Sequence, residues 1–222
     1  MNHTTSPTLA QALAQAHTLG LARIDAQLLL LHAVGCPDAG RAWLLAHDTE
    51  AMDDTVHAQF IALCQRRLAG EPVAYLTGRK EFYGLPLQVD ARVLDPRPDT
   101  ETLVDWALEV IAPLASPRVV DLGTGSGAIA LALQSQRTDA QVLAVDASTD
   151  ALAVAQANAE RLGLPVQFQS ANWLAGVEGP FDAIVSNPPY IPSADPHLAA
   201  LTHEPLQALA SGADGLEDIR TI

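Results

Sequence analysis

The sequence holds few of the residues that mark several classes of protein. Its 222 residues include two cysteines, Cys36 and Cys64, so we expect a reducing compartment and no disulfide framework. Aromatic residues make up 5% of the chain, while alanine and leucine dominate the hydrophobic residues, which favours helices over an all-β fold. The seven histidines show no zinc-like spacing, and we predict no metal site.

Positive charge and long apolar runs are also scarce. The chain has 12 Lys and Arg residues against 26 Asp and Glu residues, a formal net charge of −14. Because nucleic-acid affinity comes largely from basic side chains, this balance favours a protein or small-molecule substrate, although a local basic patch or a merely soluble surface fits the same charge. The longest aliphatic run, 28–31, is too short to cross a membrane, and residues 1–6 are polar. We therefore expect a cytoplasmic protein without a signal peptide or a membrane partner.

The first third of the chain has the apolar spacing of short helices. Ser6 and Pro7 form a helix start, because Ser caps free amides and Pro fits a first turn. The predicted helices cover approximately residues 7–20, 24–34, 43–45 and 53–70. No catalytic constellation is visible there, so we predict a helical bundle over 1–70 that packs its own core and binds a partner protein.

The segment 71–98 changes character, and strands and helices alternate after it. Two β-type runs, 80–83 and 87–89, flank a turn and predict a β-hairpin that links two domains. The domain that follows, 99–222, begins with a helix capped by Asp99 or Thr100, with an inner face formed by Leu103, Trp106, Ala107 and Val110. Its later strands and helices fall approximately at 119–120, 128–133, 142–145, 151–162, 166–168 and 181–185. This order predicts an α/β Rossmann-like fold, with a parallel sheet and ligands at the carboxyl ends of its strands.

A glycine-rich run, Asp-Leu-Gly-Thr-Gly-Ser-Gly at 121–127, lies between the first strand and its helix. Glycines let a ligand approach the backbone where any Cβ would clash, and amides at a helix start can donate to that ligand. Gly123, Gly125 and Ala128 also fit the dinucleotide pattern G-x-G-x-x-A, and a plain tight turn is another alternative. The preceding strand and following helix favour ligand binding.

The next strand ends at Asp146, whose carboxylate can accept both hydroxyls of an adenosine ribose. A helix cap is the alternative, because Ser148 and Asp150 follow closely. We favour the ribose role, since neighbouring strand ends place Asp146 beside the glycine loop. Adenosylmethionine and nicotinamide cofactors both contain that ribose, so Asp146 does not choose between them.

The run Ser-Asn-Pro-Pro-Tyr at 186–190 does choose, because it suits transfer to a poorly nucleophilic nitrogen. An amide or exocyclic amine has a delocalised lone pair, and acceptors aimed at its N–H groups stabilise the positive charge that develops. Asn187 offers a side-chain oxygen and Pro188 a backbone carbonyl, while Pro188 and Pro189 stiffen the loop. Tyr190 can stack on the planar acceptor group. A simple loop after a strand is the weaker alternative.

These motifs together resemble class I methyltransferases of the N-methylating type. Further segments are similar to the peptide chain release factor glutamine methyltransferases, the PrmC/HemK family. They are Gly-Glu-Pro-Val-Ala-Tyr-Leu-Thr-Gly at 70–78, Glu-Phe-Tyr-Gly-Leu at 81–85, Pro-Arg-Pro-Asp-Thr-Glu at 96–101, Glu-Pro at 204–205, Ala-Leu at 208–209 and Gly-Ala-Asp-Gly-Leu at 212–216. The resemblance covers most of 70–216, and the N-terminal helices agree with the family in kind only.

The resemblance implies an enzyme that methylates the glutamine of the Gly-Gly-Gln loop of release factors. S-adenosylmethionine would supply the methyl group, giving N5-methylglutamine and S-adenosylhomocysteine, and the bundle over 1–70 would bind the substrate protein. Cofactor-binding residues would be Gly123, Thr124, Gly125, Ser126, Gly127, Asp146, Trp173 and Asn187, with Asp121 near the amino group of the cofactor. The amide would be held by Asn187, Pro188, Pro189 and Tyr190. No nucleic-acid or membrane partner is expected.

Two departures and several alternatives remain open at this level. Asp95 stands where the family usually has an apolar residue, which puts the packing of the hairpin in question. A family domain would continue beyond Ile222, so we expect an incomplete sheet, an exposed apolar edge and self-association. Alternative functions are glutamine methylation of a ribosomal protein, adenine-N6 methylation of nucleic acid, and a cofactor-binding module that the shortened sheet leaves inactive.

Overall fold

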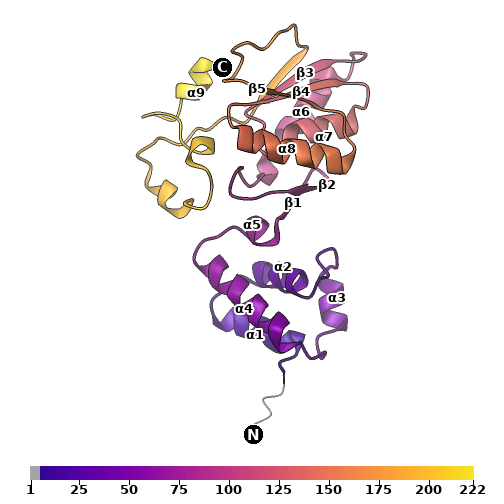
Figure 1. Ribbon diagram of the computed structural model, residues 1–222, viewed down its shortest axis with the longest axis vertical. Helices are drawn as coiled ribbons and strands as arrows, with labels where there is room; N and C mark the ends of the chain where they lie inside the picture. The colour runs from indigo at the N-terminus through magenta and orange to yellow at the C-terminus, as the bar shows by residue number, and fades with distance from the viewer. Residues whose placement is uncertain (1–5) are drawn as a thin grey trace. The chain divides into compact units, whose positions relative to one another are not determined.

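The polypeptide divides between Thr77 and Gly78 in the computed structural model, which describes residues 6–222. The two units are Met1–Thr77 and Gly78–Ile222 (Figure 1). The polar run 1–5, for which we predict no signal peptide, lies outside the described residues. Helix α5 (Val73–Thr77) closes the first unit and the β-hairpin opens the second, so the segment 71–98 is shared between them.

Short helices build the first unit. Four of them precede α5: α1 (Leu9–Thr18), α2 (Arg23–Ala33), α3 (Arg41–Ala46) and α4 (Asp54–Leu68). Phe60 and Cys64 of α4 are fully buried, and they pack in a core with Leu29 and Leu30 of α2. An aliphatic core on this scale gives the unit its own hydrophobic stabilisation.

The first helix starts two residues later than we predict from Ser6. Thr8 is its N-cap: the Thr8 hydroxyl accepts from the Gln11 amide, and the Gln11 side chain accepts from the Thr8 amide. This reciprocal pair is a capping box, which satisfies two amides at once. Ser6 instead donates its hydroxyl to Asp54 at 2.9 Å, so the prediction of a Ser6 cap is wrong.

The second unit contains the predicted parallel sheet. Its strands are β3 (Arg118–Leu122), β4 (Gln141–Asp146), β5 (Gln167–Ser170) and β6 (Ala183–Ser186), in the spatial order β5-β4-β3-β6. In the sheet register Leu122 pairs with both Val145 and Ser186, and Asp146 pairs with Ser170. The carboxyl ends of the four strands therefore meet along one edge, where such sheets bind ligands. The α/β fold prediction is confirmed.

Three helices accompany the sheet: α6 (Glu101–Ile111), α7 (Ala128–Gln136) and α8 (Thr149–Leu162). Helix α7 is buried along nearly its whole length, from Ala128 to Gln134. Helix α6 buries Val104, Ala107 and Ile111, whereas Trp106 and Val110 are 66% and 50% exposed. The predicted inner face of α6 is therefore wrong for these two residues. Sequence periodicity alone leaves the facing stripe uncertain by one position, which is about 100° around a helix.

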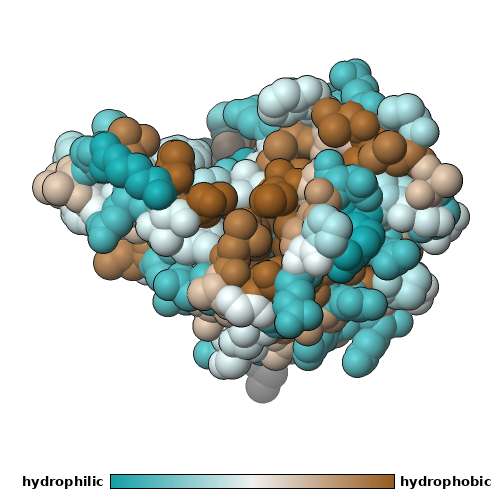
Figure 2. Space-filling view, turned by 90° about the horizontal axis from the view of Figure 1, so that it is seen from above, coloured by the Kyte–Doolittle hydropathy of each residue, from teal (hydrophilic) through white to brown (hydrophobic). Residues whose placement is uncertain are grey.

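Apolar side chains reach the surface near the edge strand. Strand β6 pairs with β3 on one side only, and Ile184 in β6 is 51% exposed. Figure 2, which views the surface from above, shows several brown patches of apolar side chains between polar ones. Exposed apolar area of this kind is prone to pairing with another chain, and the self-association that we expect stays a prediction.

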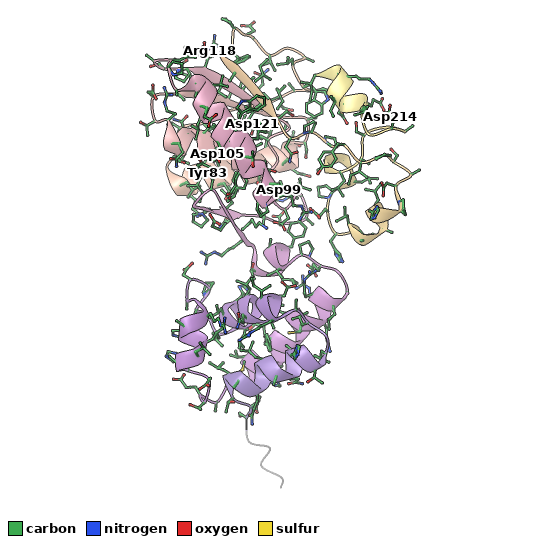
Figure 3. The ribbon with its side chains drawn as sticks, turned by 180° about the vertical axis from the view of Figure 1, so that it is seen from behind. Tyr83, Asp99, Asp105, Arg118, Asp121 and Asp214 are labelled. Atoms are coloured by element: carbon green, nitrogen blue, oxygen red, sulfur yellow. The ribbon has the colours of Figure 1, made fainter. Side chains whose placement is uncertain are left out.

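The hairpin consists of β1 (Arg79–Phe82) and β2 (Leu85–Gln88), joined by Tyr83 and Gly84. Both turn residues have positive φ, 52° and 78°, which matches the right-handed twist of a two-residue hairpin. The Tyr83 hydroxyl donates to Asp105 Oδ1 of α6 at 2.6 Å, and the two labels lie together in Figure 3. The carboxylate of Asp105 raises the pKa of Tyr83 because the hydrogen bond favours the phenol.

Asn158 of α8 ties the hairpin to the glycine loop. It is fully buried, and its Oδ1 accepts from the Gln88 amide at 2.7 Å. Its Nδ2 donates to the carbonyl oxygens of Gln88, at 2.9 Å, and Ser126, at 3.0 Å. One buried amide thus satisfies backbone groups of two segments that are far apart in sequence.

Candidate active site

The glycine loop follows β3, and its three glycines share a left-handed backbone conformation. Gly123, Gly125 and Gly127 have positive φ angles of 72°, 56° and 84°. A Cβ at Gly127 would lie 3.0 Å from the side chain of Leu131 and 3.2 Å from that of Ala155, so glycine lets α7 and α8 pack closely. A Cβ at Gly125 would meet nothing within 4 Å. The loop is therefore open on its Gly125 side.

Asp146 lies beside this loop, as predicted. One of its oxygens, Oδ2, accepts from the Gly125 amide at 2.9 Å, and Oδ1 accepts from the Ser148 amide at 2.9 Å. Ser148, rather than Asp146, is the N-cap of α8, since its hydroxyl accepts from the Ala151 amide. Each carboxylate oxygen of Asp146 keeps a further lone pair for a ligand.

Asp121 is buried completely at the end of β3, at the centre of the sheet in Figure 3. Its Oδ2 accepts from the Thr124 hydroxyl at 2.6 Å and from the Ala130 amide at 3.2 Å. Its Oδ1 has no hydrogen-bond partner among residues 6–222. Burial raises the pKa of Asp121 to about 7 against the effect of the two hydrogen bonds, and the nearby Asp146 carboxylate adds to the rise.

Trp173 lies in the turn after β5 and reaches the glycine loop. A Cβ at Gly123 would lie 3.2 Å from the Trp173 ring, which also packs on the core residues Val120 and Leu122. The indole nitrogen donates to Asp218 Oδ1 in α9 (Glu217–Thr221) at 3.2 Å. Trp173 has a φ of 52°, which is uncommon for a bulky residue and is held here by packing and the hydrogen bond.

The Asn-Pro-Pro-Tyr segment leaves β6 next to the end of β3. Ser186, the last residue of β6, donates its hydroxyl to the Leu122 carbonyl at 2.8 Å. Asn187 follows and donates through Nδ2 to the Thr100 hydroxyl oxygen at 3.3 Å. Its neighbour Tyr190 is 62% exposed. The structure therefore brings the predicted acceptor motif to the same sheet edge as the glycine loop.

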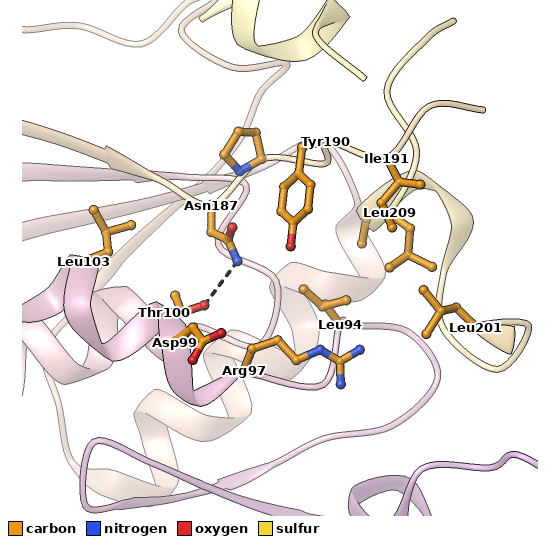
Figure 4. Close-up of a pocket in the computed structure, with 12 residues that line it drawn as sticks. Leu94, Arg97, Asp99, Thr100, Leu103, Asn187, Tyr190, Ile191, Leu201 and Leu209 are labelled. Carbon is orange, nitrogen blue, oxygen red and sulfur yellow. Dashed lines mark hydrogen bonds between the residues drawn. The ribbon is translucent and has the colours of Figure 1, made fainter. Parts of the chain in front are cut away.

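A cavity of about 370 Å³ opens beside Asn187 (Figure 4). Three separate segments of the second unit line it: the turn before α6 with the start of α6, the Asn-Pro-Pro-Tyr segment, and the loop before α9. The lining residues are Leu94, Arg97, Asp99, Thr100, Leu103, Asn187, Pro188, Tyr190, Ile191, Leu201, Ala208 and Leu209. Most of these side chains are apolar, and four polar ones, Arg97, Asp99, Thr100 and Asn187, lie among them.

Backbone pairing holds the outer wall of this cavity. The Ile191 amide donates to the Leu209 carbonyl at 3.0 Å, and the Ser211 amide donates to the Ile191 carbonyl at 2.9 Å. Gly215, with a φ of 78°, approaches the backbone of Tyr190 so closely that any Cβ there would collide with the Tyr190 carbonyl. The loop before α9 is thus shaped around the Asn-Pro-Pro-Tyr segment.

An ionic cluster around two buried carboxylates, those of Asp95 and Glu204, supports the other wall. Arg97 donates to Glu204 Oε1 at 2.5 Å and to Asp95 Oδ2 at 3.4 Å, and Lys80 lies 3.1 Å from Asp95 Oδ1. The Glu204 side chain is 3% exposed, so its charge depends on these partners. Asp95, which departs from the family pattern, is accommodated because both its oxygens face cations.

Sequence reasoning missed the parts of this site that no single motif contains. We use Arg97 only as a family signature and Asp218 not at all. The prediction that Asp99 or Thr100 caps α6 is wrong, because Thr100 occupies the N-cap position without a side-chain cap hydrogen bond and Asp99 lies in the preceding 3-10 turn. A buried acidic residue such as Glu204 has no local signal that identifies its partner 107 positions away. For the segment Pro-Arg-Pro-Asp-Thr-Glu at 96–101, the resemblance to the family is the only signal in the sequence that links it to the site.

The part of the chain that the structure describes shows neither a metal-binding cluster nor a membrane-spanning helix. Across residues 6–222, no group of three or more His, Cys, Asp or Glu side chains is arranged to hold a metal ion. Within those residues, no helix combines the length and the apolar character needed to span a membrane.

Two family models and several relatives match the chain. A model described as the methyltransferase small domain matches residues 100–212, and one described as the PrmC N-terminal domain matches residues 8–78. The release factor glutamine methyltransferase of Burkholderia pseudomallei is 45% identical, over 99% of this chain and 80% of its own. That of Escherichia coli K12 is 44% identical, over 95% of this chain and 76% of its own. The ribosomal protein L11 methylase structure from Lactobacillus delbrueckii subsp. bulgaricus is 34% identical, over 41% of this chain and 47% of its own, with a TM-score of 0.36.

The two family models together extend from the helical unit through the sheet and its Asn-Pro-Pro-Tyr segment. The curated relatives match nearly the whole chain and carry one name, which is the family that the sequence motifs predict. This chain belongs to the release factor glutamine methyltransferases.

Proposed function

We propose that the chain transfers a methyl group from S-adenosylmethionine to the side-chain amide nitrogen, N5, of the glutamine in the Gly-Gly-Gln loop of release factors. The products are N5-methylglutamine and S-adenosylhomocysteine. The observation that carries the proposal is the meeting of Asp121, Asp146 and Asn187 at adjacent strand ends, since cofactor and amide must lie side by side for direct transfer. The relatives named release factor glutamine methyltransferase point to the same substrate, and nothing in the site favours a ribosomal protein or an adenine base.

S-adenosylmethionine is the cofactor, and the residues around the glycine loop fit it. The Gly125 side of the loop is open, and Asp146 beside it keeps free lone pairs for two ribose hydroxyls. The unpaired Oδ1 of Asp121 provides an acceptor near the loop for an amino group. We assign cofactor binding to the run Gly123–Gly127 with Asp146, Trp173 and Asn187. When bound, the cofactor supplies a methyl group made electrophilic by a positively charged sulfur.

The Asn-Pro-Pro-Tyr segment prepares the amide nitrogen. Asn187 Oδ1 and the Pro188 carbonyl accept from the two N–H groups of the glutamine amide, which orients the nitrogen and stabilises the positive charge that develops on it. Pro188 and Pro189 keep these acceptors in place without movement during the reaction. Tyr190, whose ring is largely exposed beside the cavity, stacks on the amide plane. The displaced proton leaves to water.

The first unit is the proposed binding domain for the release factor. Ile24 and Leu28 lie one helical turn apart on α2 and are 67% and 45% exposed, so they form an apolar strip on that helix. Replacing both with Glu is expected to raise the KM for the release factor while leaving the affinity for S-adenosylmethionine unchanged. A cytoplasmic location, where release factors act, completes the proposal.

Mass spectrometry of a release factor after incubation with the chain and S-adenosylmethionine tests the reaction directly. We expect one added methyl group on the Gly-Gly-Gln glutamine. At saturating S-adenosylmethionine, the Asn187→Ala variant should transfer at least about a hundredfold more slowly, by analogy with loss of one transition-state hydrogen bond. Absence of the methyl group with the unaltered, cofactor-binding chain would refute the proposed substrate.

A further inference from the structure

We propose that Thr100 is a positioning residue that holds the Asn187 amide with its oxygen toward the substrate. The inference rests on the proposed function, because it assigns a cause to the orientation that the acceptor role of Asn187 requires. Thr100 ends the 3-10 turn η1 (Pro98–Thr100) and occupies the N-cap position of α6.

The hydroxyl of Thr100 does not perform the task usual at its position. An N-cap Thr normally has extended backbone angles, and its oxygen accepts from an amide in the first turn of its helix. Thr100 instead has helical angles, φ −68° and ψ −19°, and makes no side-chain cap hydrogen bond. Its Oγ1 accepts from Asn187 Nδ2 at 3.3 Å, across 87 positions of sequence (dashed line in Figure 4).

This contact selects between two orientations that have nearly the same shape. A half-turn of the Asn187 amide would exchange its oxygen and its NH₂ group, and packing hardly distinguishes them. In the exchanged orientation, the NH₂ group would face the NH₂ group of the glutamine substrate, donor against donor. In the structure the Thr100 oxygen accepts from the Nδ2 end of Asn187, and this pairing leaves Oδ1 for the substrate.

Both ends of the contact are anchored. On one side, Ser186 pairs with Leu122 in the sheet and bonds to its carbonyl through the hydroxyl. On the other, the Thr100 amide donates to the Arg97 carbonyl at 3.0 Å, and the Arg97 side chain bonds to buried Glu204. The Thr100 oxygen is therefore preorganised, so little reorganisation is needed when substrate arrives.

Two variants of Thr100 test the inference with release factor as substrate. Thr100→Val keeps the branched shape but removes the hydroxyl, and we expect kcat to fall about tenfold. Thr100→Ser keeps the hydroxyl and should restore kcat to within about threefold of the unaltered chain. Loss of one positioning hydrogen bond has effects of this order. Thr138→Val, the same change in an exposed turn, is the matched control and should leave kcat unchanged.

Cofactor affinity and melting temperature separate positioning from folding. Both should stay close to those of the unaltered chain in Thr100→Val, since Thr100 is not among the residues that we assign to the cofactor and its side chain is only partly buried. The inference is overturned if Thr100→Val retains full kcat, if Thr100→Ser is as slow as Thr100→Val, or if the loss follows weaker cofactor binding or a lower melting temperature. Failure of the unaltered chain to methylate the glutamine would instead overturn the proposed function.

Discussion

The glycine loop and the Asn187 cavity occupy the same sheet edge but are built in different ways. Seven consecutive residues and one carboxylate from the next strand form the loop, and its shape follows from three positive φ angles. The cavity takes its residues from three segments spread over residues 94–209. The proposed cofactor side is thus a local structure, whereas the proposed substrate side exists only when distant segments pack together. A substitution on one side should therefore change the property that depends on that side and leave the other largely unaffected.

The largest effect is expected from Gly215→Ala, which adds a methyl group against the Tyr190 carbonyl in a left-handed backbone conformation. The clash should displace the Asn-Pro-Pro-Tyr segment, and we expect methyl transfer to fall about a hundredfold, as a misplaced acceptor can cause. Cofactor affinity, measured by calorimetry, should change less than threefold. Gly176→Ala is the control, since it has a similar φ of 74° with nothing within 4 Å. Equal losses in the two variants would count against the clash.

The pH dependence of stability tests the cofactor side through Asp121. Burial raises its folded-state pKa to about 7, so its contribution to stability is fully present below the unfolded-state value of 3.8 and is lost as pH rises through 7. Between pH 5 and 7 the free energy of unfolding should fall by about 2 kcal/mol through this group. In Asp121→Asn this component should be absent, as urea titrations at both pH values can measure. Equal pH dependence in both proteins would show that Asp121 is ionised throughout.

Cofactor binding should reverse part of that pKa rise. A cationic group beside Asp121 favours the carboxylate, so S-adenosylmethionine should bind more tightly at pH 7 than at pH 5 and should release a proton on binding. Calorimetry in two buffers of different ionisation enthalpy measures that proton. The Asp121→Asn variant serves as comparison, because it lacks the titrating carboxylate and should not release this proton. No proton release by the unaltered chain would contradict the assignment of Asp121.

Loss of the ionic cluster should affect the substrate side alone. Glu204→Gln removes the charge that holds Arg97, and we expect the free energy of unfolding to drop by about 1.5 kcal/mol, less than for fully buried pairs because Arg97 is 40% exposed. The KM for the release factor should rise while cofactor affinity stays constant. Asp214→Asn, which breaks an exposed pair with Arg220, should have almost no effect on either quantity. A stability loss of the same size in Asp214→Asn would show that the buried pair contributes no more to stability than an exposed one.

The smallest effect is expected from Trp173→Phe, which keeps a ring beside Gly123 but loses the hydrogen bond to Asp218. Stability should decrease by about 1 kcal/mol, the usual net value of one hydrogen bond, and cofactor affinity should fall less than threefold. Trp106→Phe, at an exposed position on α6, provides the matched control for ring size. A tenfold loss of cofactor affinity would show that the indole itself, beyond its packing, is needed at the loop.

Where prediction succeeded, the physical signal was short in sequence. The hairpin follows from two β-type runs around a turn, and the parallel strands follow from apolar runs separated by helices. The helical caps were less secure, because Ser6 and Thr8 compete for one helix start and only the Gln11 side chain decides between them. The prediction of the buried face of α6 was wrong for a similar reason, because local sequence offered more than one choice. Several apolar stripes exist on that helix, and only its neighbours choose one.

The sequence by itself indicated the glycine loop, the Asn-Pro-Pro-Tyr motif and the family, because each is marked by short runs of adjacent residues. Only the tertiary structure decided that Thr100 contacts Asn187, that Arg97 pairs with Glu204, and that Asp121 is buried with one unpaired oxygen. Those facts depend on where distant segments of chain are brought together. Hydrogen bonds and ion pairs act over a few ångströms of space, whatever the separation in sequence.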